Sequence, residues 1–210
     1  MRIMKLYSIV ISTILLTGCA ISLTKPLTGP LWVSTSSKDE FTDQVTKMVT
    51  VGERPNENFL ITQSLHYYPF VGTHDGEVYV GIRSGGTYRM PVGTVQLRID
   101  DNPAWTINTE ETPVLFAPKP PSVSVDSANM AGIVNNMQNE MMNNMSKTLS
   151  PYTAATGDKA RRIIREMING KVIKYRIIGF NQVGSSTGEV KIDESFIEAL
   201  KVIGINPETL

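Results

Sequence analysis

The sequence predicts a mainly β (α+β) protein: an antiparallel β-sandwich with short flanking helices and a Met/Asn-rich helical insertion. Three observations support this class. Between residues 31 and 117, short runs rich in Val, Ile, Thr, Tyr and Phe alternate with turn-forming clusters of Gly, Pro, Asn and Asp. Residues 127–149, rich in Met and Asn, show helical periodicity instead. The apolar content of 41% suits a folded core and is too low for a protein with several membrane spans.

Length, charge and cysteine content limit the classes of protein. At 210 residues, the chain fits one domain with short additions. Twenty basic and twenty acidic side chains, with a pI near 6.7, provide no overall attraction to nucleic acid, so no nucleic-acid partner is expected. The single cysteine, Cys19, excludes an intramolecular disulfide framework and a zinc site made of several thiolates.

The first twenty residues have the composition of a secretion signal. Arg2 and Lys5 supply a basic start, and the eleven residues from Leu6 to Leu16 are predominantly apolar. A helix of that length measures about 16 Å, roughly half of the ~30 Å hydrocarbon layer of a membrane. Residues 1–18 are therefore predicted to be a signal peptide rather than a membrane-spanning anchor.

The end of this signal, Leu16-Thr17-Gly18-Cys19, resembles the bacterial lipobox. The resemblance implies cleavage before Cys19, a diacylglycerol thioether on its sulfur and an N-acyl chain such as palmitate on its amino group. Three acyl chains make membrane attachment effectively permanent. Ala20 stands where an inner-membrane retention signal would have Asp, which implies the outer membrane, facing the periplasm. The alternative is an ordinary signal peptide with an incidental cysteine.

The mature chain divides into a tether and one domain. Residues 19–30 contain two prolines and a glycine and are expected to be the lipidated tether. The domain spans 31–204, is interrupted at 120–150 by a Pro-rich linker and the helical insertion, and is followed by a tail at 205–210. Before the insertion we expect strands at 31–37, 44–52, 59–68, 77–83, 94–100 and 113–117.

Two of these strands alternate apolar and polar residues. The segment Val78–Arg83 places Val, Val and Ile on one face and Tyr, Gly and Arg on the other, and Val95–Asp100 repeats the alternation. Each strand is therefore expected to bury one face in the core and to expose the other to solvent.

The insertion is expected to be one amphipathic helix from Ser127 to Leu149. The polar face of this helix is largely asparagine, which is a mediocre helix former. The helix must therefore pack against another part of the protein or a partner to be stable. Its apolar stripe is the predicted partner-binding surface, with residues spaced by three or four: Met130, Val134, Met137, Met141 and Met145.

The same methionines allow a second interpretation. Thioethers are soft ligands that suit Cu(I), which makes an envelope copper or small-ligand protein the alternative function. The candidate ligands are Met137, Met141, Met142 and Met145. Histidine and further cysteine, which would strengthen a copper site, are missing from this segment. A helix lying on the membrane is a third option, which the scarcity of Lys and Arg disfavours.

The C-terminal part is expected to alternate helices and strands. A short helix over 158–168 ends at Asn169-Gly170, and strands at 171–180 and 189–192 flank a polar turn, Gly184–Gly188. Ser195 and Glu198 have the spacing of a capping box that opens a last helix, which Gly204 closes.

Catalysis finds little support, so an enzyme is not expected. His66 and His74 are the two imidazoles, and no metalloprotease motif, phosphate-binding loop or nucleophile elbow is present. The basic cluster on the 158–168 helix is interpreted as a solvated face, with a phosphate or acidic-partner site as the alternative: Lys159, Arg161, Arg162 and Arg165.

Three stretches together resemble the periplasmic β-sandwich modules of the invasion-associated locus B type and the related VasI accessory proteins of type VI secretion. The first is Leu31–Ser34 followed by Ser37–Glu40. The second is Val78–Arg83 leading into Val95–Asp101 and then Trp105–Ile107. The third is the closing order: short helix, strand Val172–Ile178, polar turn, and Ile192–Leu200 running into a helix. The resemblance covers residues 31–116 and 157–204. It departs from those families in lacking their paired cysteines and in the insertion.

The resemblance implies a non-enzymatic envelope fold. The predicted function is an outer-membrane-anchored periplasmic lipoprotein that acts as an interaction or adaptor module of the cell envelope or of a secretion assembly. Lipid at Cys19 would provide the anchor, no other cofactor is expected, and the Met-rich helix would contact an envelope protein.

Overall fold

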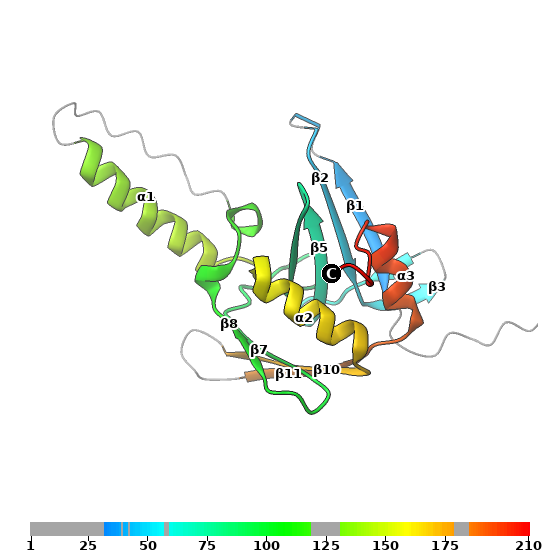
Figure 1. The fold of residues 1–210 in the computed structure, drawn as a ribbon. Coiled ribbons are helices and arrows are strands. Elements are labelled where there is room, and N and C mark those ends of the chain that lie inside the picture. The colour runs from blue at the N-terminus through cyan, green and yellow to red at the C-terminus, as the bar shows by residue number, and fades with distance from the viewer. Residues whose placement is uncertain (1–31, 39, 42, 57–58, 119–130, 179–184) are drawn as a thin grey trace, which may run out of the picture.

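Two antiparallel sheets form the body of the domain (Figure 1). The computed structural model describes residues 32–38, 40–41, 43–56, 59–118, 131–178 and 185–210. The larger sheet has the order β1-β2-β5-β6-β9, with bounds Val33–Lys38, Val45–Thr50, Tyr67–His74, Glu77–Ser84 and Tyr152–Thr156. The smaller sheet has the order β11-β10-β7-β8, with bounds Ser185–Lys191, Val172–Ile178, Thr94–Ile99 and Trp105–Ile107.

The remaining elements flank these sheets. A short hairpin consists of β3 (Glu53–Asn56) and β4 (Phe59–Ile61). The helices are α1 (Ala131–Thr148), α2 (Gly157–Asn169) and α3 (Glu194–Val202), with two 3-10 turns, η1 (Thr109–Glu111) and η2 (Val114–Phe116). The predicted mainly β, sandwich-like α+β class with flanking helices is therefore confirmed. Among the described residues, no helix is both long and apolar enough to cross a membrane.

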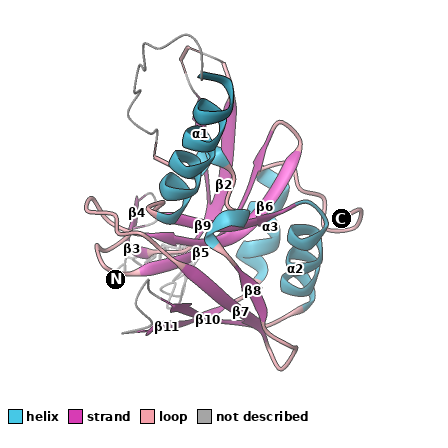
Figure 2. Cartoon of the chain, turned by 90° about the vertical axis from the view of Figure 1, so that its left-hand side faces the viewer, coloured by secondary structure: helices cyan, strands magenta, loops and turns pink. Residues whose placement is uncertain are grey.

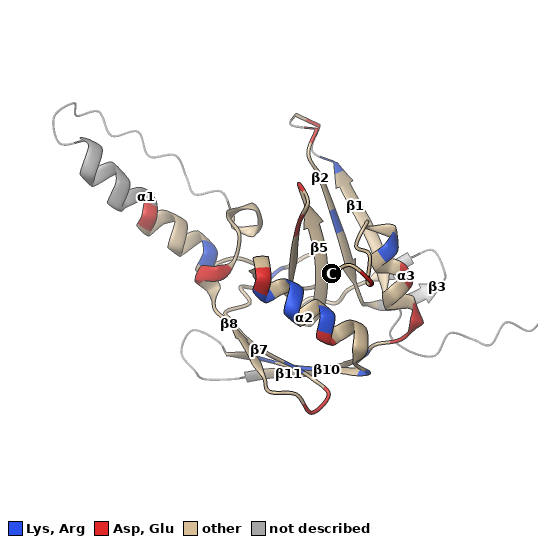
Figure 3. Cartoon of the chain, viewed as in Figure 1, with Lys and Arg blue, Asp and Glu red and all other residues tan. Residues whose placement is uncertain are grey.

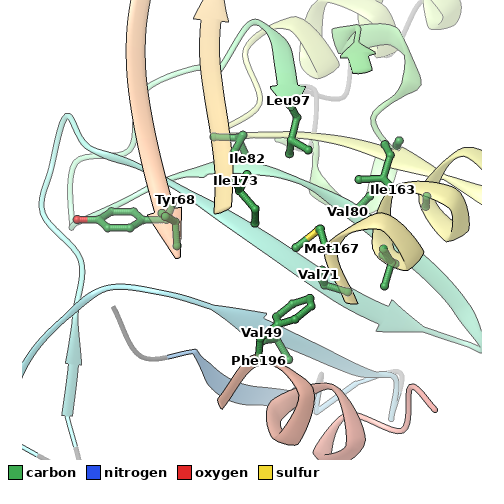
Figure 4. Packing of buried hydrophobic residues seen from close by; sticks show 14 of the residues in the cluster. Val49, Tyr68, Val71, Val80, Ile82, Leu97, Ile163, Met167, Ile173 and Phe196 are labelled. Atoms are coloured by element: carbon green, nitrogen blue, oxygen red, sulfur yellow. The ribbon is translucent and has the colours of Figure 1, made fainter. Parts of the chain in front are cut away.

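The main core lies between the inner faces of the two sheets and is completed by α2 and α3 (Figure 4). Helix α2 packs on β6 and β9, and α3 packs on β1 and β2. Alternation in β6 and β7 directs every second residue into this core, as predicted. Both sheets and both helices contribute fully buried side chains: Val49, Val71, Val80, Ile82, Leu97, Ile163, Met167, Ile173 and Phe196.

Trp32 joins the beginning of the described domain to its end. Its ring centroid lies 4.7 Å from that of Phe196, and its Nε1 donates to the carbonyl oxygen of Lys191 at 3.0 Å. Its main-chain N–H donates to Ser195 Oγ at 3.0 Å. These contacts bridge about 160 residues of sequence, so β1 and α3 form one structural unit.

The outer face of the larger sheet differs from the expectation of a solvated face. Tyr79 is 3% exposed, and its ring meets Phe116 at 5.0 Å between centroids. Phe116 also lies 5.7 Å from Phe70 and 5.0 Å from Tyr152. The prediction failed because η2 folds over the sheet and covers it with an aromatic cluster, which strand periodicity in β6 does not reveal.

Segment 113–117 was predicted to be a strand, which is wrong. Its N–H groups close 3-10 turns instead: Phe116 N donates to Pro113 O, and Ala117 N donates to Val114 O, both at 3.0 Å. This turn buries Phe116 against the sheet and leaves Val114 and Leu115 exposed. The adjacent residues Val114 and Leu115 are therefore both exposed, whereas a strand would turn them to opposite faces.

Two further strand predictions need correction. Segment 59–68 is interrupted, because β4 ends at Ile61 and Leu65 has a φ of 68° in the turn before β5. Strand β9 was not predicted. It pairs with β6 where Gly81 lies opposite Ala154, and a Cβ on Gly81 would lie 1.9 Å from the carbonyl oxygen of Thr153. The close approach of these two strands therefore requires glycine.

The closing elements are mostly where they were expected. Strand β11 begins at Ser185, so most of the predicted polar turn is strand paired with β10. The cap of α3 is Asp193 rather than Ser195, because the Asp193 carboxylate accepts the N–H of Ser195 at 3.0 Å. Gly204, with a φ of 87°, ends that helix as predicted. Ile205, in the predicted tail, is buried in the core.

Candidate functional site

The predicted site residues fall in three parts of the chain. Cys19 and Met130 lie outside the described residues. Val134 and Met137 belong to α1, in the part of the helix where side chains are not described. Met141, Met142 and Met145 lie in the described second half of α1. Met141 is 73% exposed and Met145 is 58% exposed, while Met142 is partly buried.

Helix α1 is held to the domain by its C-terminal end and projects away from the sheets (Figures 1 and 2). It contacts η1 and η2. Lys147 Nζ donates to the carbonyl oxygen of Glu110 at 2.8 Å, and Ser146 is buried. Just after the helix, Ser150 Oγ donates to the carbonyl oxygen of Phe116 at 2.6 Å. The docking expected for this helix thus involves its last turns, and Met141 and Met145 remain in solvent.

Exposed apolar side chains gather at this junction. Five of the twelve exposed large hydrophobic residues in the described chain come from α1, the residue after it and η2. We name this group the α1 surface: Val114, Leu115, Met141, Met145 and Leu149. Because η2 contacts α1, these exposed residues come from two elements that lie side by side on the domain. Clustered exposure of this kind is typical of an interaction site.

The sequence identified the methionines of this surface but not the residues of η2. Val114 and Leu115 were assigned to a strand, where alternate residues would face opposite sides. A 3-10 turn instead leaves both of them exposed, at 58% and 45%. A signal for this turn was available in Pro113, which cannot donate to a sheet ladder.

Two of the four basic residues of α2 bond other parts of the domain. Lys159 forms an ion pair with Glu111, at 2.6 Å between Nζ and Oε2. Arg165 donates to the main-chain oxygen of Leu210 at 2.6 Å. Figure 3 shows acidic positions beside the basic ones of α2, and in the sequence Asp158 precedes and Glu166 follows the basic residues. The contacts of Lys159 and Arg165 support a structural role for these two residues, which tie α2 to η1 and to Leu210.

A surface hollow of about 630 Å³ lies beside α2, and two of the carboxylates that line it are already bonded. Glu166 accepts from Trp105 Nε1 at 3.1 Å and from Asn102 Nδ2 at 3.3 Å. Asp100, which has a φ of 48°, accepts the N–H of Val172 at 2.9 Å. Glu166 and Asp100 therefore already stabilise the loops around the hollow.

The two histidines lie at opposite ends of β5. Eight residues of strand separate them by about 26 Å, so they cannot share one site. At the hairpin after β5, Thr46 Oγ1 is 3.3 Å from His74 Nδ1, and His74 Nε2 is 3.4 Å from Asp75 Oδ2. Asp75 is exposed and also accepts from Gln44 at 3.4 Å. These long contacts tie the hairpin to β2, and this is the role that the geometry supports.

Two buried polar groups on the outer face of β6 were not identified from the sequence. Tyr79 Oη and Arg83 Nε are buried and have no hydrogen-bond partner among the described residues. Burial raises the pKa of Tyr79 well above its usual range, with Asp75 and Glu77 adding to the effect. Burial also lowers the pKa of Arg83, and the charge of Arg89 lowers it further. Unpartnered buried groups of this kind mark positions that packing alone does not explain.

Comparisons of the chain with protein-family models, with curated proteins and with solved structures gave no match. The resemblance to the invasion-associated locus B and VasI modules therefore stays a prediction, and function is argued from the chain's own residues.

Proposed function

We propose that this protein is a lipid-anchored interaction module of the outer membrane, in which the α1 surface binds an apolar groove on a periplasmic protein. The observation that carries the proposal is the exposure of Met141 and Met145, one helical turn apart, on a helix whose last turns hold it to the domain. An amphipathic helix presented in this way is a common ligand for a groove in another protein. Methionine adapts its shape to such a groove because it is unbranched and polarizable.

The charge of α1 favours a protein groove over a lipid surface. Glu140 and Lys147 are the only ionisable residues among its eighteen. Lys147 is bonded to the carbonyl oxygen of Glu110 and points toward the domain. A helix that binds anionic lipid usually carries several Lys and Arg on its polar face. The polar residues of α1 are mainly asparagines, which suit the rim of a protein interface.

The anchor explains how such a module would reach its partner. Lipid on Cys19 would hold the chain at the membrane, and residues 20–31 would lead to Trp32, the start of the described domain. Twelve extended residues span at most about 40 Å. The partner is therefore expected to be a membrane-associated protein or a periplasmic protein that comes close to the membrane.

Site-specific photo-crosslinking in the native cell tests the interaction. A photoreactive amino acid replaces Met141 in the full-length chain. The matched control replaces Val202, which is 68% exposed at the end of α3. We expect one protein adduct from position 141 and none from position 202. The substitution Leu115→Asp should reduce the adduct severalfold, because it places a charge in the proposed contact.

Three outcomes would overturn this proposal. They are an adduct with lipid alone, an adduct with a second copy of the chain, and equal adducts from positions 141 and 202. Cu(I) titration of the purified protein decides the alternative function. Stoichiometric binding tighter than micromolar that is lost in Met141→Leu/Met145→Leu would replace the interaction module by a copper carrier.

The anchor is tested separately. Cys19→Ser should release the protein from the membrane fraction, because no acyl chain can then be attached to the side chain. If Cys19→Ser remains with the membranes, the lipobox interpretation is wrong, while the crosslinking result still decides the role of the α1 surface.

A further inference from the structure

A second candidate site lies on the outer face of the larger sheet, at the end where β6 pairs with β9. The strand registers place Tyr68 of β5 opposite Arg83 of β6, and Arg83 opposite Tyr152 of β9. The Arg83 guanidinium therefore belongs to a row between two tyrosine positions. Arg89, in the loop after β6, donates from Nη1 to Tyr152 Oη at 3.0 Å and lies 5.8 Å from the centroid of that ring.

Arg83 has no acceptor for its charge among the described residues. Its Nε–H is buried without a partner, and no described carboxylate forms an ion pair or hydrogen bond with this side chain. A buried donor without an acceptor destabilises the folded state, and does so more strongly when the group is charged. By contrast, Arg98 and Arg161 each form an ion pair with a carboxylate, that of Asp101 and that of Asp158.

The charge of Arg89 increases this destabilisation instead of reducing it. Arg89 is a second cation, and its charge acts against that of Arg83, as the lowered pKa of Arg83 reflects after the larger effect of burial. Two guanidinium groups beside the same tyrosine, with no carboxylate paired to either among the described residues, provide strong donors that an anion can use. Arginine forks match the planar carboxylate and the phosphate group well.

We propose that Arg83 and Arg89 form a binding site for an oxyanion, the phosphate or carboxylate group of a small ligand, beside the ring of Tyr152. The anion would accept from N–H groups of the Arg83 and Arg89 guanidinium groups and reduce the repulsion between them. The site uses β6, β9 and the loop after β6 and does not include the α1 surface. It therefore stands or falls independently of the proposed interaction.

Selective ¹⁵N labelling of arginine in the lipidated protein, held in micelles of an uncharged detergent, reports this site directly. Inorganic phosphate and acetate are titrated separately, each against sodium chloride of equal ionic strength. We expect a saturable change of the Arg83 Nε–Hε resonance with phosphate, with acetate or with both, and a smaller, non-saturating change with chloride. The response identifies which oxyanion the site takes.

Replacing Arg83 itself would also change the packing of the sheet. The test therefore uses variants at two other arginines. Arg89→Gln, at an exposed loop position, should weaken the binding about tenfold because it removes one charge-assisted donor. Arg98→Gln, an exposed arginine paired with Asp101 in the other sheet, should leave the binding unchanged. The proposal is overturned if the Arg83 resonance does not saturate with either anion, if chloride produces the same change, or if both variants respond like the unmodified protein.

Discussion

The two faces of the larger sheet are built on the same five strands and differ in how their polar groups are satisfied. On the inner face, Ile82 and Val80 are fully buried, and the one buried hydroxyl of β9, that of Thr153, donates to the carbonyl oxygen of Gly93 at 2.6 Å. On the outer face, Tyr79 and Arg83 each keep a buried polar atom without a partner. The inner face is thus organised for stability, whereas the outer face retains groups that cost stability and can serve a ligand.

Truncation of the inner core should give the largest effect. Phe196 is fully buried against Trp32, so Phe196→Ala should lower the free energy of unfolding by about 3–5 kcal/mol through lost burial and a cavity. Phe116 lies in the smaller outer cluster and is 8% exposed. Phe116→Ala should therefore lower the free energy of unfolding by less, about 2–3 kcal/mol. Urea unfolding monitored by circular dichroism measures both values. An equal or larger loss for Phe116→Ala would contradict the ranking of the two faces.

Replacement of Arg83 should instead raise the free energy of unfolding. Arg83→Met removes a partly buried charge without an acceptor and keeps apolar volume, so the free energy of unfolding should rise by about 1 kcal/mol. Arg98→Met, at an exposed ion pair, should change it by less than about 0.5 kcal/mol. The same unfolding measurement applies, at low phosphate concentration. A marked destabilisation by Arg83→Met would show that its stem or guanidinium contributes to packing.

Tyr79 and Tyr175, whose pKa values are both raised, should give the smallest and most specific difference in stability. Burial raises the pKa of Tyr175 to about 12, and its hydroxyl donates to the carbonyl oxygen of Tyr67. The folded state then holds the phenolic proton more tightly than the unfolded state, whose tyrosine titrates near pH 10. This contribution to stability is complete below pH 10 and is lost as the pH rises from about 10 to 12.

Stability measured between pH 9 and 12 checks this contrast. Tyr175→Phe should make the alkaline fall shallower and cost about 1 kcal/mol at pH 7, because a hydrogen bond is lost. Tyr79→Phe should also make the fall shallower, because burial raises that pKa too, but at pH 7 it should be neutral or stabilising. An unchanged alkaline slope in both variants would refute the assignment of the two burial effects.

Local patterns predicted much of this fold. Alternation identified β6 and β7 and their core faces, and helical periodicity together with Gly204 located α2 and α3. These predictions succeeded because each depends on neighbours a few residues away. Strand β9 was missed for the opposite reason: its short Tyr-Thr-Ala-Ala-Thr sequence has little pattern, and pairing with β6 makes it a strand.

The candidate sites divide in the same way. The sequence alone was enough to predict a lipid anchor at Cys19 and an apolar stripe on the Met-rich helix, because both depend on spacing along the chain. Only the tertiary structure decided that Met141 and Met145 stay exposed, that η2 adds Leu115 to them, and that Arg83 is left without a carboxylate. Exposure and unmet hydrogen bonds depend on which distant segments pack together, and this information is not contained in any local pattern.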